Sequence, residues 1–106
     1  MSFRLSTVVF AALLSSTAVA GNATCDQLAE SYRQILEAHP GSMTSEDIEI
    51  VLTNVEKGCE ADNQLVKYDS VATCVVRAEG EDAWMRCLKL DGSSDFYRWF
   101  GKLARR

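Results

Sequence analysis

Four cysteines constrain the fold of this chain more than any other feature. All four lie after residue 20 of a 106-residue sequence: Cys25, Cys59, Cys74 and Cys87. A domain of this size buries only about 60–65% of its unfolded surface, so its core alone gives marginal stability. Small exported domains commonly add disulfides to such a core. The even number of cysteines therefore predicts two disulfides.

Turn signals between the cysteines favour one pairing out of the three that are possible. The midpoint of the first two cysteines falls in the turn Pro40-Gly41-Ser42, and that of the last two falls at Gly80-Glu81. Residues equidistant from the turn of an antiparallel helical hairpin lie at the same level, so each pair would staple one hairpin. A nested arrangement that joins the first and last cysteines stays open. The preferred pairs are Cys25–Cys59 and Cys74–Cys87.

Residues 1–20 have the pattern of a cleavable export signal. Arg4 supplies the positive charge, Leu5 to Leu14 form the apolar stretch, and Ala18-Val19-Ala20 is an A-x-A cleavage motif. The apolar stretch is about half of the roughly 20 residues that a membrane-spanning helix needs, which argues against a permanent anchor. We therefore predict a signal peptide over 1–20 and one small helical domain over 21–106, located in the periplasm or outside the cell.

Capping motifs predict the first two helices. The segments Thr24–Gln27 and Thr44–Asp47 have the spacing of capping boxes, and Met43 precedes the second in the position of a hydrophobic staple. Apolar residues at spacings of three and four follow each cap, as on the buried face of a helix. We expect Pro40 to end the first helix and Gly58 to end the second.

Three shorter helices are predicted in the rest of the chain. The third starts at Asp62-Asn63 and ends before Gly80, and the fourth places Trp84, Cys87 and Leu88 on one stripe. The last runs from Phe96 to Arg106, and Trp84 and Met85 are expected to fill the core. The sequence shows no strand alternation. The predicted fold is all-α, a bundle of four to five short helices made of two stapled hairpins and a C-terminal helix.

Residues 95–106 form an amphipathic segment with two possible uses. Its apolar residues recur at i, i+3, i+4 and i+7: Phe96, Trp99, Phe100 and Leu103. Its cations lie off that face: Arg98, Lys102, Arg105 and Arg106. In one interpretation the aromatic face closes the core, which a small domain needs. In the other, the segment rests on an anionic membrane or docks into a groove on a partner.

Charge and residue types exclude several classes of function. Residues 21–94 hold six basic and fourteen acidic residues, a balance of −8, which argues against nucleic-acid binding. The single histidine, His39, lies in a turn, and many carboxylates occupy helix starts, where the helix dipole favours them. The cysteine spacings suit neither a redox pair nor a zinc site. We expect no enzymatic activity, no cofactor and no metal.

The segment Thr24-Cys25-Asp26-Gln27-Leu28, with Cys59 pairing back to it, resembles the small periplasmic acid-stress chaperones of enteric bacteria. The resemblance implies an exported helical protein that binds unfolding clients when its acidic groups lose charge. The second cysteine pair and the basic aromatic tail depart from that pattern. Our first hypothesis is a non-enzymatic, chaperone-like module that binds a protein partner or client. The alternative is a secreted membrane-active or effector-like protein that uses residues 95–106.

Overall fold

A computed structural model describes residues 22–105 of the chain. Within this range the chain is helical and contains no strand, which confirms the predicted all-α class. The predicted signal peptide, its cleavage site and Arg106 lie outside the described residues. None of the helices described is long and apolar enough to cross a lipid bilayer. The elements are α2 (Cys25–Ala38), α3 (Ser45–Ala61), α4 (Asp69–Arg77), α5 (Glu81–Arg86), the 3₁₀ helix η2 (Cys87–Lys89) and α6 (Ser93–Ala104).

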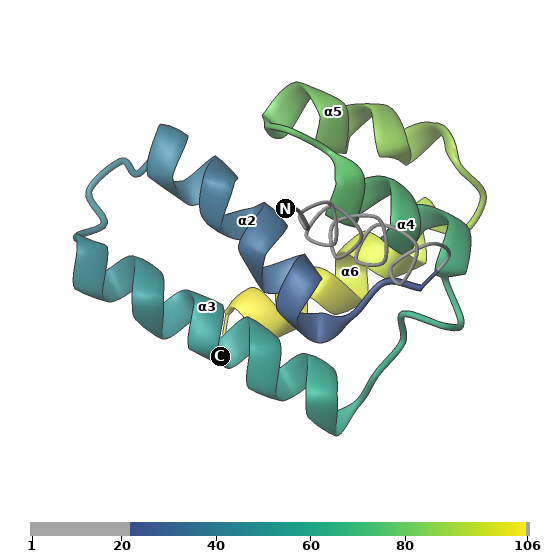
Figure 1. The fold of residues 1–106 in the computed structure, drawn as a ribbon, viewed down its shortest axis with the longest axis horizontal. Helices are drawn as coiled ribbons and strands as arrows, with labels where there is room; N and C mark the ends of the chain where they lie inside the picture. The colour runs from purple at the N-terminus through teal and green to yellow at the C-terminus, as the bar shows by residue number, and fades with distance from the viewer. Residues whose placement is uncertain (1–21, 106) are drawn as a thin grey trace, which may run out of the picture.

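Helices α2 and α3 form an antiparallel hairpin (Figure 1). Both predicted capping boxes are present. The Thr24 hydroxyl accepts the Gln27 N–H at 3.2 Å, and the Gln27 side chain accepts the Thr24 N–H at 3.0 Å. Thr44 and Asp47 make the same reciprocal pair at 3.1 and 2.9 Å. Each cap satisfies backbone donors that the first turn of its helix leaves unpaired.

Two disulfides cross-link the helices, with the pairing that the turn positions predict. Cys25 at the start of α2 joins Cys59 near the end of α3, with Cα atoms 5.7 Å apart. Cys74 of α4 joins Cys87 at the start of η2, with Cα atoms 5.9 Å apart. All four thiols are used in this way. The first bridge holds the open end of the α2–α3 hairpin, and the second fixes α4 to the α5–η2 segment.

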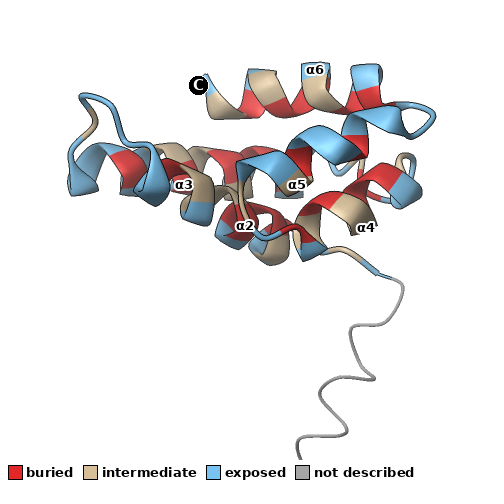
Figure 2. Ribbon diagram, turned by 90° about the horizontal axis from the view of Figure 1, so that it is seen from above, coloured by how far each residue is buried: buried red, intermediate tan, exposed pale blue. Residues whose placement is uncertain are grey.

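One hydrophobic core draws residues from every α-helix, and a smaller cluster lies towards the turn of the α2–α3 hairpin. The main core includes the fully buried side chains of Leu28, Val55, Val75 and Phe96. The small cluster consists of Leu36, Ile48 and Leu52, with Met43 packed against it as a hydrophobic staple requires. Figure 2 shows α6 as a separate layer above the other helices, with its buried residues on the side that faces them.

The apolar face of α6 is part of the core, as the first of the two interpretations of residues 95–106 predicts. Its four apolar residues are all buried: Phe96, Trp99, Phe100 and Leu103. Arg98, Lys102 and Arg105 are exposed on the other side of the helix. The helix begins at Ser93, three residues earlier than predicted, because Gly92 at a φ of +85° adopts the left-handed conformation that precedes it.

Two further helix boundaries differ from the prediction, one for a tertiary and one for a local reason. Helix α3 continues past Gly58 to Ala61, because Gly58 and Cys59 are buried and the Cys25–Cys59 bridge holds this last turn against α2. Helix α4 begins at Asp69 instead of Asn63. The Asn63 side chain accepts the Leu65 N–H at 2.8 Å and so replaces the first turn of a helix with an Asx turn.

The expected positions of Met85 and Leu88 are also wrong. Both were predicted to face inwards, but they are 56% and 44% exposed. Trp84 is buried in the core, as predicted. Helix α5 ends at Arg86 and the chain tightens into η2 at Cys87. A 3₁₀ helix has three residues per turn, so this change rotates Leu88 off the stripe that Trp84 and Cys87 share.

Candidate functional site

An apolar groove of about 400 Å³ lies between α2, α5 and α6. Seven of its eight lining residues are aromatic or aliphatic, and Glu81 is the one charged residue among them. The floor and walls come from three segments that are distant in the sequence. The lining residues, which define the apolar groove, are Tyr32, Ile35, Glu81, Trp84, Met85, Leu88, Tyr97 and Phe100.

Stacked aromatic rings form the floor of the apolar groove. The rings of Tyr32 and Trp84 stack with centroids 5.6 Å apart. Phe100 meets both of them edge-on, at 4.8 Å from Tyr32 and 5.2 Å from Trp84. Offset and edge-to-face contacts at these distances are the favourable geometries for aromatic pairs. The floor is therefore a closely packed carbon surface.

The indole N–H of Trp84 and the hydroxyl of Tyr97 are paired within the protein. The Trp84 indole N–H donates to the Ser31 hydroxyl at 2.9 Å, and that hydroxyl donates to the Val75 carbonyl at 2.8 Å. The Tyr97 hydroxyl donates to the Trp84 carbonyl at 2.7 Å. Burial raises the pKa of the Tyr32 and Tyr97 hydroxyls, so both phenols stay neutral at physiological pH. The groove thus offers apolar contact and little competition from unpaired polar groups.

The rim of the apolar groove is exposed and carries a polar contact at one end. Met85 and Leu88 project from α5 and η2 with about half of their surface in solvent. The Glu81 carboxylate lies 3.7 Å from His39 Nε2, so that α5 meets the end of α2. Exposed apolar side chains gathered around a hollow mark interaction sites more often than scattered ones do.

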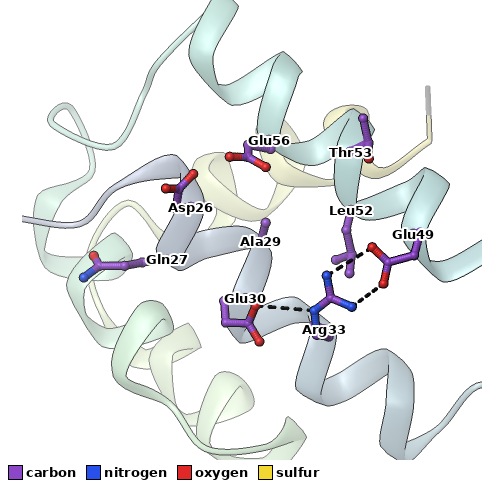
Figure 3. Close-up of a pocket in the computed structure, with 9 residues that line it drawn as sticks. All are labelled: Asp26, Gln27, Ala29, Glu30, Arg33, Glu49, Leu52, Thr53 and Glu56. Carbon is purple, nitrogen blue, oxygen red and sulfur yellow. Dashed lines mark hydrogen bonds and ion pairs between the residues drawn. The ribbon is translucent and has the colours of Figure 1, made fainter.

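A second, acidic groove of about 490 Å³ lies between α2 and α3 (Figure 3). Its single cation, Arg33, is already engaged by three carboxylates. Arg33 binds Glu49 through two nitrogens, and it lies 3.3 Å from Glu30 and 3.6 Å from Glu37. The hydrogen bonds from Arg33 hold the pKa of Glu49 below its ordinary value. This ion-pair network ties the two helices together, and the carboxylates around Arg33 would repel a further anion.

Three carboxylates meet at the other end of the acidic groove. The oxygens of Asp26, Glu56 and Glu60 lie within 4.8 Å of one another, and Figure 3 shows Asp26 and Glu56 facing each other from α2 and α3. The hydrogen bond to Asp26, together with the charges of Asp26 and Glu60, raises the pKa of Glu56. Carboxylates are ligands that hard cations prefer. These groups are exposed or half-exposed, however, as is common on an acidic surface, and we assign no metal site to them.

The sequence prediction missed this carboxylate cluster because its members come from two helices. A signal was present in the chain. Asp26 follows Cys25 and Glu60 follows Cys59, so a bridge between these cysteines brings the two acids together. Glu56 lies one turn before Glu60 on the same helix face. Acidic residues next to bridged cysteines therefore predict like-charge contacts.

The eight residues predicted for a partner or membrane contact divide into a buried set and an exposed set. The apolar four are in the core, where Phe100 also forms part of the floor of the apolar groove. Arg98 makes an ion pair with Asp95 at 2.8 Å, and Lys102 and Arg105 are exposed on the same side of α6. Arg106 lies outside the described residues. The described part of residues 95–106 therefore exposes its cations at the surface, whereas its apolar face is buried.

Comparison with protein-family models, with curated proteins and with solved structures found no match. Function is therefore inferred from the geometry of these surfaces. Of the two grooves described, the apolar groove has the exposed hydrophobic rim and the paired polar atoms that suit binding of an apolar ligand group. The acidic groove is occupied by its own ion pairs.

Proposed function

We propose that this protein is an exported, non-catalytic binding module, which takes apolar side chains of a basic segment of a protein partner or client into the apolar groove. The observation that carries the proposal is the pair of exposed side chains, Met85 and Leu88, beside a floor of packed aromatic rings. Burying these two side chains under a partner would remove apolar surface from water, which favours association.

The shape of the apolar groove favours a peptide segment as its occupant. The groove is open along three helices and its volume of about 400 Å³ accommodates a few side chains. An amphipathic helix inserts its side chains at i, i+3, i+4 and i+7 into a hydrophobic groove of this kind. Met85 has a flexible and polarisable side chain, which adapts to anchors of different shape. Such adaptability suits a chaperone-like protein with more than one client.

Charge favours a basic segment over an acidic one. Glu81 is the one charged residue in the lining of the apolar groove, and Asp82 follows it in α5. Residues 21–94 as a whole carry a balance of −8. Complementary charge speeds the encounter of two proteins and disfavours partners of like charge. Lysine or arginine beside the apolar anchors of the partner would therefore meet Glu81.

The membrane alternative has less support. The apolar face of α6 is buried in the core, so insertion of that face into lipid would require α6 to leave the fold. The exposed cations that remain are worth only about 1 kcal/mol each near an anionic membrane. The acidic surface of residues 21–94 would oppose that attraction.

Export and the absence of catalysis are parts of the same proposal. Two disulfides are typical of an oxidising compartment, which supports the periplasm or the extracellular space. A nucleophile would need an activating partner. Within residues 22–105 the thiols are all oxidised, and His39 is exposed with Glu81 as its neighbouring carboxylate.

The test uses a fluorescent synthetic peptide with leucines at i, i+3, i+4 and i+7 and lysines on its other face. Binding is measured by fluorescence anisotropy. We expect Met85→Glu to weaken binding by about tenfold or more, because it places a charge on the apolar rim. Ile50→Glu is the matched control, since Ile50 is 54% exposed on α3 and does not line the apolar groove. Circular dichroism of both variants verifies that the fold is retained.

A charge reversal tests the choice of a basic partner. Glu81→Lys should transfer the preference of the protein from the lysine-bearing peptide to a version with glutamates in the same positions. Equal binding losses in Met85→Glu and Ile50→Glu would show that the peptide binds elsewhere. An unchanged preference in Glu81→Lys would remove the basic segment from the proposal.

A further inference from the structure

A smaller polar groove of about 280 Å³ lies between α6 and the segment that joins α3 to α4. We call it the Trp99 groove. From α6 it is lined by Arg98, Trp99 and Lys102, and from the joining segment by Gln64 and Tyr68. Its α6 side belongs to residues 95–106, which hold four basic residues against Asp95, and its charged lining residues are Arg98 and Lys102 with Asp62 and Asp95.

Trp99, which lines this groove, carries an unpaired and buried hydrogen-bond donor. Its side chain is 9% exposed, and its indole nitrogen has no hydrogen-bond partner within residues 22–105. The other tryptophan behaves differently, since the Trp84 indole N–H donates to Ser31 at 2.9 Å. Buried donors in native proteins are nearly always paired, and an exception needs a cause such as an absent ligand. An acceptor that enters the Trp99 groove would supply the missing partner.

The charged residues of the groove differ in how far they are engaged. Arg98 pairs with Asp95 at 2.8 Å, and the Gln64 amide donates to Asp62 at 2.9 Å. Lys102 makes no ion pair with any of the described residues. The unengaged donors of the lining residues therefore include the ammonium group of Lys102 and the indole N–H of Trp99.

From these observations we infer that the Trp99 groove is a binding site for a single carboxylate group. The Lys102 ammonium pairs with the carboxylate, and the Trp99 indole N–H donates to one of its oxygens. Asp62 and Asp95 also line the groove and repel a dianion more strongly than a monoanion, which disfavours a phosphate dianion relative to a carboxylate. The volume fits a small organic acid or the C-terminal residue of a peptide. Neither the apolar groove nor the proposed function enters this inference.

Access to the indole nitrogen requires a local movement, because the atom itself has almost no surface exposed to solvent. Arg98 and Lys102 are long and exposed, so their side chains rotate at little cost. A carboxylate that draws Lys102 towards itself would open this path. Binding should therefore change the environment of Trp99 and leave Trp84 as it is.

The two tryptophans provide the measurement. In a ¹H–¹⁵N spectrum of the oxidised protein, each indole N–H gives one resonance, and Trp99→Phe assigns them by removing one. Titration with sodium acetate, with sodium chloride at equal ionic strength as the reference, should shift the Trp99 resonance in a saturable manner. The Trp84 resonance serves as an internal control, because its hydrogen bond to Ser31 lies inside the protein.

A second titration distinguishes the two sources of a carboxylate. A short blocked peptide with a free C-terminus is compared with the same peptide ending in an amide. Tighter binding of the free peptide than of acetate would assign the groove to peptide C-termini, and equal binding would assign it to small acids. Both of these results support a carboxylate site.

Lys102→Ala should weaken the binding by about tenfold, whereas Lys57→Ala, an exposed lysine of α3 that does not line the groove, should leave it unchanged. An unchanged Trp84 resonance verifies that each variant is folded. The inference fails if the Trp99 resonance moves no more than that of Trp84, or if Lys102→Ala and Lys57→Ala bind alike. Met85→Glu should have no effect here, so this test and that of the apolar groove are independent.

Discussion

The α2–α3 hairpin and the C-terminal half, residues 69–104, reach the helical state by different means. The hairpin helices have 14 and 17 residues, and each begins with a complete capping box. Helices α4, α5 and α6 have 9, 6 and 12 residues, and none begins with a hydrogen bond from a capping side chain. Isolated helices shorter than about 12–15 residues are marginal in water. The C-terminal half therefore depends more on its tertiary contacts.

The aromatic residues show where those contacts are. Trp84, Phe96, Tyr97, Trp99 and Phe100 all belong to the C-terminal half, and their rings contact one another in a continuous series. The far end of the hairpin is instead closed by a small aliphatic cluster. A helix that begins with its own capping box needs fewer large side chains. Short helices without a capping box are held by large rings, while each half of the molecule has one disulfide.

The largest expected effect comes from the centre of the aromatic series. Phe96→Ala should lower the free energy of unfolding by about 3–5 kcal/mol, because Phe96 is fully buried and the change leaves a cavity. Leu52→Ala in the small hairpin cluster should cost less, towards the lower end of about 2–5 kcal/mol. Urea denaturation followed by circular dichroism gives both values, with the exposed Val66→Ala as the reference. A larger loss for Leu52→Ala would contradict the greater dependence of the C-terminal half on packing.

Removal of each disulfide should cause the next largest loss in the free energy of unfolding. The Cys25–Cys59 bridge closes 34 residues and the Cys74–Cys87 bridge closes 13. The entropy of loop closure predicts losses of about 4 and about 3 kcal/mol for the paired Cys→Ser variants. Urea denaturation measures both. A larger loss at Cys74–Cys87 would show that the uncapped helices need their bridge beyond its effect on the unfolded chain.

The capping boxes should have a smaller effect, limited to the hairpin. Thr24→Ala and Thr44→Ala should each cost about 1 kcal/mol, because each removes the acceptor of a backbone N–H. Ser94→Ala in the first turn of α6 is the matched control and should stay within about 0.5 kcal/mol. Thermal unfolding of the three variants measures these stability costs. A cost for Ser94→Ala equal to that for Thr24→Ala would remove the distinction between capped and uncapped helices.

The smallest expected effects concern charge in the acidic groove, where two glutamates have pKa shifts of opposite sign. The pKa of Glu56 is raised above 4.5, so between 4.5 and the raised value the folded state binds more protons than the unfolded state. Stability then falls as the pH rises through this window. Glu56→Gln should therefore stabilise the protein at neutral pH, and the gain should vanish below pH 4.5.

Glu49 should behave in the opposite way, because its pKa is lowered by Arg33. The stability that it contributes is present above 4.5 and is lost as the pH falls through the lowered pKa. Glu49→Gln should thus destabilise the protein at neutral pH and have no effect at pH values below the lowered pKa of Glu49. Thermal unfolding from neutral pH to below pH 4 compares the two variants. Shifts of the same sign in both would contradict this account of the acidic groove.

Local signals in the sequence, together with the positions of the cysteines and turns, were sufficient to predict the fold class, both disulfides and the starts of the first two helices. Thr24 and Thr44 are followed by the N3 partner that a capping box needs, so these starts depend on nearby residues alone. The start of α4 was placed too early because Asn63 makes an Asx turn in competition with the helix. The end of α3 was placed too early because tertiary contacts bury Gly58, which local rules regard as a stop signal.

The grooves could not be predicted in this way. The apolar groove combines Tyr32 and Ile35 of α2 with residues of α5 and α6, and only the packing of these three helices brings them together. The exposure of Leu88 at its rim depends on the change from α-helix to 3₁₀ helix at Cys87, which the helical pattern of the sequence does not indicate. Likewise, periodicity gave no reason to expect that the indole N–H of Trp99 would stay unpaired.

The hydroxyl of Ser31 has a consequence for the rate at which a partner would bind. This one oxygen links α2 to the Val75 carbonyl of α4 and to the Trp84 indole of α5. Any rotation of Trp84 would leave its buried indole N–H unpaired, so the ring keeps one orientation before a partner arrives. A segment that docks beside Trp84 therefore contacts a wall that is already ordered, so little free energy is lost in ordering that wall on binding. Association at this wall should be limited by encounter and orientation, without a slow rearrangement of the binding protein.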